Sequence, residues 1–417
     1  AGVSSRFFQR DSQYFVTTDG PDGTASTFRI THTLGIDPLQ QYLVQFPDGR
    51  LQALSIAWDT RPRAAGGQRW FHLYPQDTPT HEDALHWTGA FQNASARCIG
   101  CHTTGLVKGY DPDTQRYATQ WQEPQVGCEA CHGAGSRHLA WAAGDRRAPD
   151  KGLALALTKT WAPQGTTLPI PTGSGGFGVQ ERVCATCHSR RAELQQPSSG
   201  IDFHDAYALS PLLEGLYFAD GRMRDEVYET GSFLQSRMHQ QHVTCGNCHE
   251  PHSARLRIEG DGLCLQCHQT LFAARPHPAP ADTAAPGTCV SCHMPTRTYM
   301  GIDVRHDHSL RVPGDDATRY PHGPLLAAAR RNEAAVAPQL LAFAQDRSKP
   351  VILRATALVE SARFDTPAQR QTATALLASA DPLLRVGAVA AHARLPADQR
   401  LQRLSPLLQD PAKSVRM

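Results

Sequence analysis

Cys245-Gly-Asn-Cys-His249 is followed along the chain by Cys264-Leu-Gln-Cys-His268 and Cys289-Val-Ser-Cys-His293. All three units have the pattern Cys-x-x-Cys-His, and three earlier copies occupy residues 98–102, 128–132 and 184–188. The six copies use all 12 cysteines of the chain. This uniform spacing argues against a disulfide framework and against zinc sites, which are the two common explanations of a high cysteine count.

Covalent attachment of haem needs this spacing. Two thiols three positions apart can each bond one vinyl-derived carbon of the same porphyrin, and the next residue then lies under the iron as its proximal ligand. The sequence therefore predicts six haems c with iron as the cofactors. The attachment residues are Cys98, Cys101, Cys128, Cys131, Cys184, Cys187, Cys245, Cys248, Cys264, Cys267, Cys289 and Cys292, and the proximal ligands are His102, His132, His188, His249, His268 and His293.

Length and charge exclude several other classes of protein. The 417 residues suffice for two or three domains, and no apolar run approaches the roughly 18–20 residues of a membrane span. Lys and Arg total 41 against 39 Asp and Glu, which is too balanced for a nucleic-acid binder that works by charge. With its haem propionates the holoprotein is expected to be acidic, at about −4 when oxidised and about −10 when reduced.

Haem c is attached outside the bacterial cytoplasmic membrane, so the cofactor predicts an exported protein, periplasmic or extracellular. The first residues, Ala1-Gly-Val-Ser-Ser-Arg6, lack a basic start followed by an apolar stretch. We therefore expect that a signal peptide has already been removed.

The cysteine-free residues 1–97 are expected to form a small β-rich region. Runs rich in β-branched and aromatic residues predict strands over 27–33, 41–46, 51–58 and 69–74. Between two of them, Phe46-Pro-Asp-Gly-Arg50 has the Asp-Gly chemistry of a hairpin.

Residues 98–323 are predicted to be a hexahaem domain. The six motifs share 196 residues, about 33 per haem, so the haems are expected to pack against one another as the core, with little regular structure beyond short helices. Starts of successive motifs are 30, 56, 61, 19 and 25 residues apart. The two short steps at the end predict that the last three haems are neighbours.

Residues 324–417 are predicted to form an α-helical, HEAT-like solenoid. Helix starts are indicated where a capping residue precedes proline, at Pro350, Pro367, Pro382 and Pro411. Two similar segments, starting at Asp381 and Asp410, recur after 29 residues. An ordinary alanine-rich helical tail is the alternative. Because solenoids need capped ends, we expect either that the natural chain continues past Met417 or that something packs on this end.

The sixth ligand of each iron decides what such a protein does. Removing the six motif histidines from the total of 20 leaves fourteen, more than enough for bis-histidine ligation throughout. A distal ligand approaches the face opposite the proximal one, so His252 is a poor ligand for its own haem and a better one for a neighbour. Met238, Met294 and Met300 are alternative ligands, although packing is the simpler role for them. His32, His72 and His392 are expected to be structural or surface residues.

Several segments resemble the multihaem cytochromes related to the tetrahaem cytochrome of ammonia oxidisers. They are Cys128-Glu-Ala-Cys-His-Gly-Ala-Gly-Ser-Arg-His138, the doubled unit of 245–252 and 264–268, His86-Trp-Thr-Gly and 305–313. Some members of this group carry HEAT or TPR repeats at the C-terminus. On the basis of this resemblance the distal ligands are expected to be His86, His138, His204, His252, His277 and His308. A contact to a propionate or to backbone is the alternative for each.

The leading functional hypothesis is electron transfer between redox partner proteins. A variant is an extracellular homopolymer joined through end haems, in which a surplus histidine such as His81, His239, His242 or His322 would reach an iron of the next copy. The alternative is a multihaem oxidoreductase that acts on a small nitrogen or sulfur oxyanion at one open haem. The sequence holds no Cys-x-x-Cys-Lys motif, which weakens the enzyme hypothesis. The helical tail is a candidate docking surface.

Overall fold

The computed structural model describes residues 2–155, 157, 161–164, 167–171, 178–197, 202–274, 289–313, 320 and 322–417, with backbone alone for 161–164, 167–171 and 271–274. The chain forms two compact units. The first comprises Ala1–Ala154 with Thr298–Arg305, and the second comprises Leu155–Arg297 with His306–Met417. The first two Cys-x-x-Cys-His motifs thus belong to the same unit as the N-terminal region. The predicted division into residues 1–97, 98–323 and 324–417 was based on cysteine content and composition. It differs from the division into two compact units.

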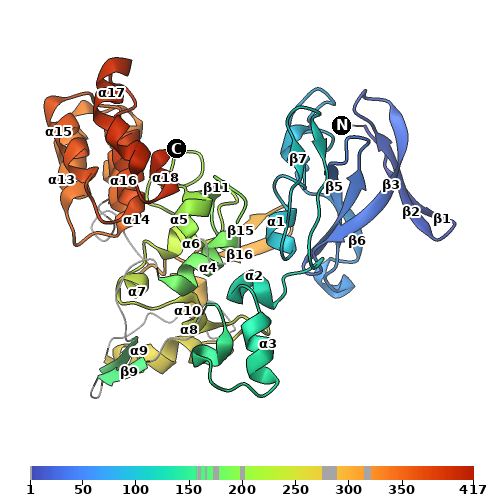
Figure 1. Cartoon of the computed structure of the whole chain (residues 1–417), viewed down its shortest axis with the longest axis horizontal. Helices are drawn as coiled ribbons and strands as arrows, with labels where there is room; N and C mark the ends of the chain where they lie inside the picture. The colour runs from blue at the N-terminus through green and yellow to red at the C-terminus, as the bar shows by residue number, and fades with distance from the viewer. Residues whose placement is uncertain are drawn as a thin grey trace. The chain divides into compact units, whose positions relative to one another are not determined.

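A six-stranded antiparallel sheet dominates the first unit, and each strand is paired with the next one along the chain (Figure 1). The four predicted strands are confirmed, and two further strands precede them. The strands are β1 (Arg6–Arg10), β2 (Gln13–Asp19), β3 (Ala25–Leu34), β4 (Leu39–Gln45), β5 (Leu51–Asp59) and β6 (Arg69–His72).

Turn chemistry fixes the register of this sheet. In the predicted hairpin between β4 and β5, the Phe46 N–H donates to the Arg50 carbonyl at 2.9 Å. Gly49 has a φ of +86°, and a Cβ atom there would lie 2.1 Å from the Tyr117 carbonyl oxygen, so only glycine fits. Asp11 and Ser12 both have positive φ, which is the conformation of a two-residue hairpin turn and joins β1 to β2.

The core of the sheet includes one residue of the first Cys-x-x-Cys-His motif. Leu43, Leu51, Ala53 and Ala94 pack with Ile99, which follows Cys98 directly and is only 2% exposed. Ile99 begins α1 (Ile99–His102). The first motif is therefore held in place by the hydrophobic core of the sheet.

The rest of the first unit consists of short elements. They are β7 (Tyr110–Asp111), β8 (Arg116–Tyr117), α2 (Cys128–His132) and α3 (Ser136–Ala142). Two strands, β15 (Thr296–Tyr299) and β16 (Asp303–His306), form a ribbon. Met300, between them, packs with the core residues Leu39, Ala57, Leu73 and Ile302, so its predicted packing role is confirmed.

The motif-bearing part of the second unit is built from short helices and two-stranded ribbons. The helices are α4 (Val179–His188), α5 (Phe203–Ala206), α6 (Glu229–Phe233), α7 (Arg237–Gln240), α8 (Cys245–Cys248), α9 (Gly262–Ala274) and α10 (Cys289–His293). The strands are β9 (Trp161–Gln164), β10 (Thr167–Pro171), β11 (Arg191–Glu193), β12 (Tyr207–Leu209), β13 (His249–Glu250) and β14 (Arg255–Leu256).

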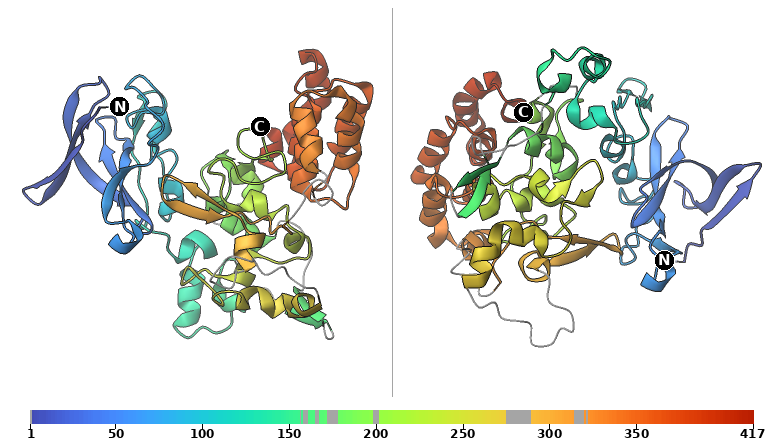
Figure 2. Two further views of the ribbon diagram at one scale, coloured as in Figure 1. Left: turned by 180° about the vertical axis from the view of Figure 1, so that it is seen from behind. Right: turned by 90° about the horizontal axis from the view of Figure 1, so that it is seen from below.

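Helices packed side by side form the C-terminal part of the second unit, as both views in Figure 2 show. They are α12 (His322–Arg330), α13 (Ala337–Gln345), α14 (Val351–Ser361), α15 (Pro367–Leu376), α16 (Pro382–Ala390), α17 (Ala397–Leu404) and α18 (Lys413–Arg416). The starts at Pro367 and Pro382 are confirmed, with Thr366 and Asp381 as N-caps that accept backbone N–H groups. Pro350 is itself the cap of α14. The HEAT-like class remains a prediction.

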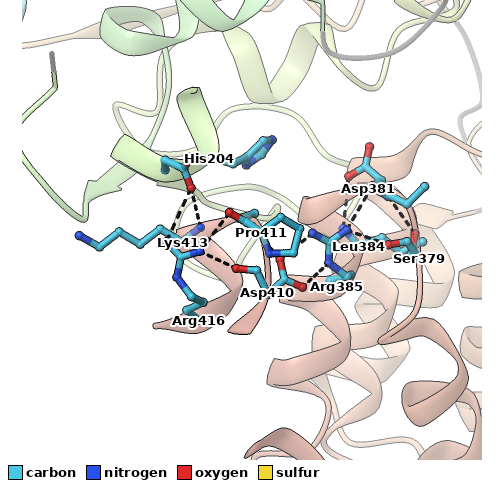
Figure 3. Close-up of polar contacts among 12 residues, drawn as sticks. His204, Ser379, Asp381, Leu384, Arg385, Asp410, Pro411, Lys413 and Arg416 are labelled. Carbon is cyan, nitrogen blue, oxygen red and sulfur yellow. Dashed lines mark hydrogen bonds and ion pairs between the residues drawn. The ribbon is translucent and has the colours of Figure 1, made fainter. Parts of the chain in front are cut away.

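The last helix docks on the haem-motif part of the same unit (Figure 3). Asp205 in α5 accepts the backbone N–H of Lys413 at 2.9 Å, and Lys413 Nζ donates to Gln195 Oε1 at 2.7 Å. Behind this contact, Arg385 binds Asp410 through two hydrogen bonds of 2.8 and 2.7 Å. The side chain of α5 that precedes Asp205 is the distal-ligand candidate His204, so the helical tail packs next to a candidate site.

We expect Arg385→Ala to loosen the docked tail. The Arg385 and Asp410 side chains are 9% and 5% exposed, so removal of the guanidinium leaves a buried carboxylate without its partner, at a cost of about 3–5 kcal/mol. Chemical denaturation followed by circular dichroism measures this loss. Arg370→Ala, which breaks the surface pair with Asp365, is the control and should cost about 1 kcal/mol or less. Equal losses in the two variants would contradict the expectation.

A second expectation concerns stability in acid. Burial lowers the pKa of His322 from 6.5 to about 4, and its Nε2 donates to the Asp220 carbonyl at 3.0 Å. The unfolded chain therefore takes up the proton first, so the contribution of His322 is complete above pH 6.5 and is lost as pH falls towards 4. The free energy of unfolding should decrease by about 3 kcal/mol across this window. His322→Gln should flatten this part of the profile, whereas His81→Gln, at an exposed histidine, should leave it unchanged.

Candidate haem-binding sites

All six Cys-x-x-Cys-His motifs lie on helical turns. They occupy α1, α2, the end of α4, α8 with the residue after it, the interior of α9, and α10. In a helix, residues three positions apart lie on one face, so each turn presents its two thiols together. None of the 12 cysteines forms a disulfide.

These turns fit a large apolar cofactor. Isolated helices of four or five residues are unstable in water, because nucleation costs more than so few hydrogen bonds return. Yet α2, α8 and α10 bury none of their own residues. A porphyrin bonded to both cysteines would supply the packing partner that they lack. In the described part of the chain, no three His, Cys, Asp or Glu side chains are arranged to hold a metal ion.

Four motifs of the second unit follow one another in space. Cys184 of the third motif is hydrogen-bonded to Cys245 of the fourth, and Gln180 in α4 accepts the Gly246 N–H at 2.8 Å. Cys264 of the fifth motif contacts Cys289 of the sixth, whose N–H donates to Asp261. The fourth, fifth and sixth motifs are neighbours, as the short spacings predict, and the third extends the row.

Burial and contacts between motifs shift the pKa values of several motif thiols. The hydrogen bond with Cys184 raises the pKa of Cys245 far above its usual range. Burial raises the pKa of Cys248, with a further contribution from Cys264 and Cys267, and burial raises the pKa of Cys289 to about 12. The hydrogen bond with Cys245 lowers the pKa of Cys184.

Two proximal histidines are oriented by hydrogen bonds at Nδ1. His293 Nδ1 donates to the Arg311 carbonyl at 2.6 Å. His188 Nδ1 lies 3.1 Å from Glu229 Oε2. Burial works to raise the pKa of Glu229, but the hydrogen bond with His188 brings it below its usual value. An imidazole held at Nδ1 keeps Nε2 for the iron, which is the arrangement that metal-binding histidines prefer.

His308 faces the proximal histidine of the fourth motif. The ring centres of His249 and His308 are 6.2 Å apart, with 27° between the ring planes. His308 Nδ1 donates to the His306 carbonyl at 2.9 Å, which leaves Nε2 available. With nitrogen–metal bonds of about 2.0 Å, two imidazoles on opposite sides of one ion have centres about 6 Å apart. The separation in the chain therefore fits a shared iron.

His138 and His252 are both bonded through Nδ1. His138 Nδ1 donates to the Lys151 carbonyl at 2.8 Å, and its ring stacks on Trp141. His252 is exposed, with Nδ1 3.0 Å from Glu250 Oε1. Both residues remain candidate ligands.

His86 and His204 are buried. His86 lies 2.8 Å from Asp19 Oδ2 through Nε2 and 2.8 Å from Thr88 Oγ1 through Nδ1. Burial works to raise the pKa of Asp19, but the hydrogen bonds from His86 and Thr18 bring it below its usual value. To bind an iron, His86 would have to leave Asp19, so its bonding favours a structural role. Burial lowers the pKa of His204, which keeps that imidazole neutral as a ligand must be. His277 lies outside the described residues.

The other histidines divide into structural and exposed groups. His392 is structural, as predicted, because Nδ1 donates to the Ala388 carbonyl and Nε2 lies 3.3 Å from Thr374 Oγ1. His32 packs edge-on against Trp121. Of the surplus histidines proposed for contacts between copies, His81 is exposed, whereas His322 is buried and bonded to Asp220, so it is not available to another subunit.

Glu229, the partner of the proximal histidine His188, was not predicted from the sequence. It lies 41 positions after His188, in a segment without any motif, and nothing in its spacing distinguishes it from other acidic residues. Only the folded chain brings its carboxylate to the proximal histidine.

Residues 67–133 match the model of the family described as cytochrome c554 and c-prime. The match runs from before β6 through the first two motifs, 98–102 and 128–132. The chain is a c-type cytochrome. Covalently bound haem c is accordingly its cofactor, and electron transport is its general role. Cytochromes of this kind are typically exported.

No protein of curated function and no solved structure shows significant similarity to the cytochrome. Among its described residues, no helix combines the length and the apolar character needed to cross a bilayer. The evidence for the number of haems and for their axial ligands therefore consists of the motifs and the geometry described above.

We expect the intact cytochrome to carry six haems and no disulfide, because every thiol is consumed in a thioether. Mass spectrometry of the denatured holoprotein counts the covalent haems directly. Replacing Cys289 and Cys292 together by alanine should lower the count to five and leave the other sites loaded. A wild-type count other than six would contradict the reading of the motifs.

Proposed function

We propose that the cytochrome transfers single electrons between protein partners in the periplasm or outside the cell, through six covalently bound and mainly bis-histidine haems c. The motif cysteines and histidines would hold the haems, which would supply one-electron ferric–ferrous chemistry, with a reduced partner as the electron donor and an oxidised partner as the acceptor. The protein supplies the ligands, the spacing and the surroundings that set each potential.

The paired imidazoles of His249 and His308 carry this proposal. Their 6.2 Å separation fits one iron bound on both faces, and an iron closed in this way has no site for a substrate. The loop that carries His308 is firmly positioned. Ser232 Oγ accepts the His308 N–H at 3.1 Å, and Asp307 accepts the Met223 N–H at 2.9 Å and the Ser309 N–H at 2.8 Å.

The row of the third to sixth motifs supports transfer rather than isolated redox sites. Contacts link Cys184 with Cys245, and Cys264 with Cys289. Cys248 and Cys264 interact electrostatically, which places the fourth and fifth motifs close together as well. Haems attached to such adjacent turns would lie near enough to pass an electron along the row.

We expect His308→Ala to open one iron, that of the haem attached to Cys245 and Cys248. Loss of one strong axial ligand converts a low-spin ferric haem to a high-spin one. Electron paramagnetic resonance of the oxidised variant should show about one high-spin equivalent per chain, while the haem count stays at six. His81→Ala, at an exposed histidine, is the control and should keep the wild-type spectrum.

The wild-type spectrum tests the proposal as a whole. A carrier should show only low-spin ferric haem at rest. One high-spin equivalent that nitrite or hydroxylamine perturbs would instead establish the enzyme hypothesis, with an open haem for a small nitrogen compound. An unchanged spectrum of His308→Ala would show that His308 does not ligate the iron held by His249.

A further inference from the structure

We infer that Glu229 tunes the haem of the third motif, attached to Cys184 and Cys187, to a lower reduction potential than it would otherwise have. The inference rests on the proposed electron-transfer function and adds a residue outside every motif to it. In this role Glu229 is a positioning residue, because it acts on the iron through His188.

The geometry joins α6 to the third motif at two points. Glu229 Oε2 lies 3.1 Å from His188 Nδ1, and the next residue, Thr230, donates from Oγ1 to the His188 carbonyl at 2.6 Å. Side chain and backbone of His188 are thus both held by consecutive residues of α6. Such a double attachment fixes the tautomer of the ring as well as its direction.

The same helix is itself firmly packed. Gly231 lies against Tyr217, where a Cβ atom would come within 2.1 Å of the phenol oxygen, and Tyr217 is 1% exposed. Ser232, which is fully buried, accepts the His308 N–H. Within five residues, α6 therefore contacts the proximal histidine of the third motif and the segment that carries the distal candidate of the fourth.

A carboxylate on Nδ1 has a definite electrostatic effect. It draws the Nδ1 proton towards itself, makes the imidazole a stronger electron donor and adds negative charge near the iron. Both effects favour the ferric ion over the ferrous ion, so they lower the potential. His293 provides the contrast within the same unit, because its Nδ1 donates to a neutral backbone carbonyl, that of Arg311.

The test is a spectroelectrochemical titration of the holoprotein in which Glu229→Gln is compared with wild type. Glutamine keeps the shape and a hydrogen-bond acceptor but removes the charge. One haem of the six should become at least tenfold easier to reduce at a fixed potential, an upward shift of about 59 mV or more for one electron. The other haems should keep their midpoints.

Two variants separate this role from simpler ones. Asp225→Asn removes an equal charge from an exposed position four residues away, and Thr230→Val removes the neighbouring hydrogen bond to His188 without a change of charge. Neither should reproduce the shift. An equal shift in Asp225→Asn would assign the effect to net charge, and one in Thr230→Val would assign it to the position of His188, so either result would overturn the inference.

Failure of the inference and failure of the proposed function give different results. If wild type holds six low-spin haems and Glu229→Gln leaves every midpoint unchanged, the tuning role is wrong and the carrier role stands. If wild type itself lacks six low-spin haems, the carrier role fails whatever the variant does.

Discussion

In the proposed holoprotein, the covalent bond between each pair of motif cysteines and a haem would be the constraint on which the motif helices depend. These helices are too short to be stable alone, and three of them bury none of their own residues. Elsewhere the chain has ordinary cores, in the sheet and among the C-terminal helices. At the motif helices that bury nothing, a bound haem would supply the packing that the chain does not.

Polar contacts between segments that are distant in sequence position the C-terminal tail and the candidate ligands. Arg385 and Asp410 secure the end of the tail, and Lys413 joins it to Asp205 beside His204. In the motif-bearing part of the same unit, α6 contacts both His188 and the segment that carries His308. Ligand positions in this protein are thus determined by residues that are themselves neither ligands nor attachment sites.

Local patterns predicted the parts of this structure that local chemistry determines. Runs rich in β-branched and aromatic residues indicated the strands from β3 to β6, the Asp-Gly turn ends at Gly49, and Thr366 and Asp381 cap the helices that they precede. The strands β1 and β2, which also contain aromatic residues, were not predicted. Partners could not be predicted, because the pairing of His249 with His308 and of His188 with Glu229 arises from folding over 59 and 41 positions. Likewise, the sequence offered no sign that His86 would bind Asp19.

Burial of Ile99 in the sheet gives the first motif a different standing from the others. Its turn belongs to the cooperative unit of the β-sheet, so backbone opening at Cys98–Cys101 should require the free energy of opening that core. Motifs on helices that bury nothing have no such support until haem is bound. The motifs therefore differ in preorganisation: the first is held by the core of the sheet, whereas those on α2, α8 and α10 bury no residue of their own.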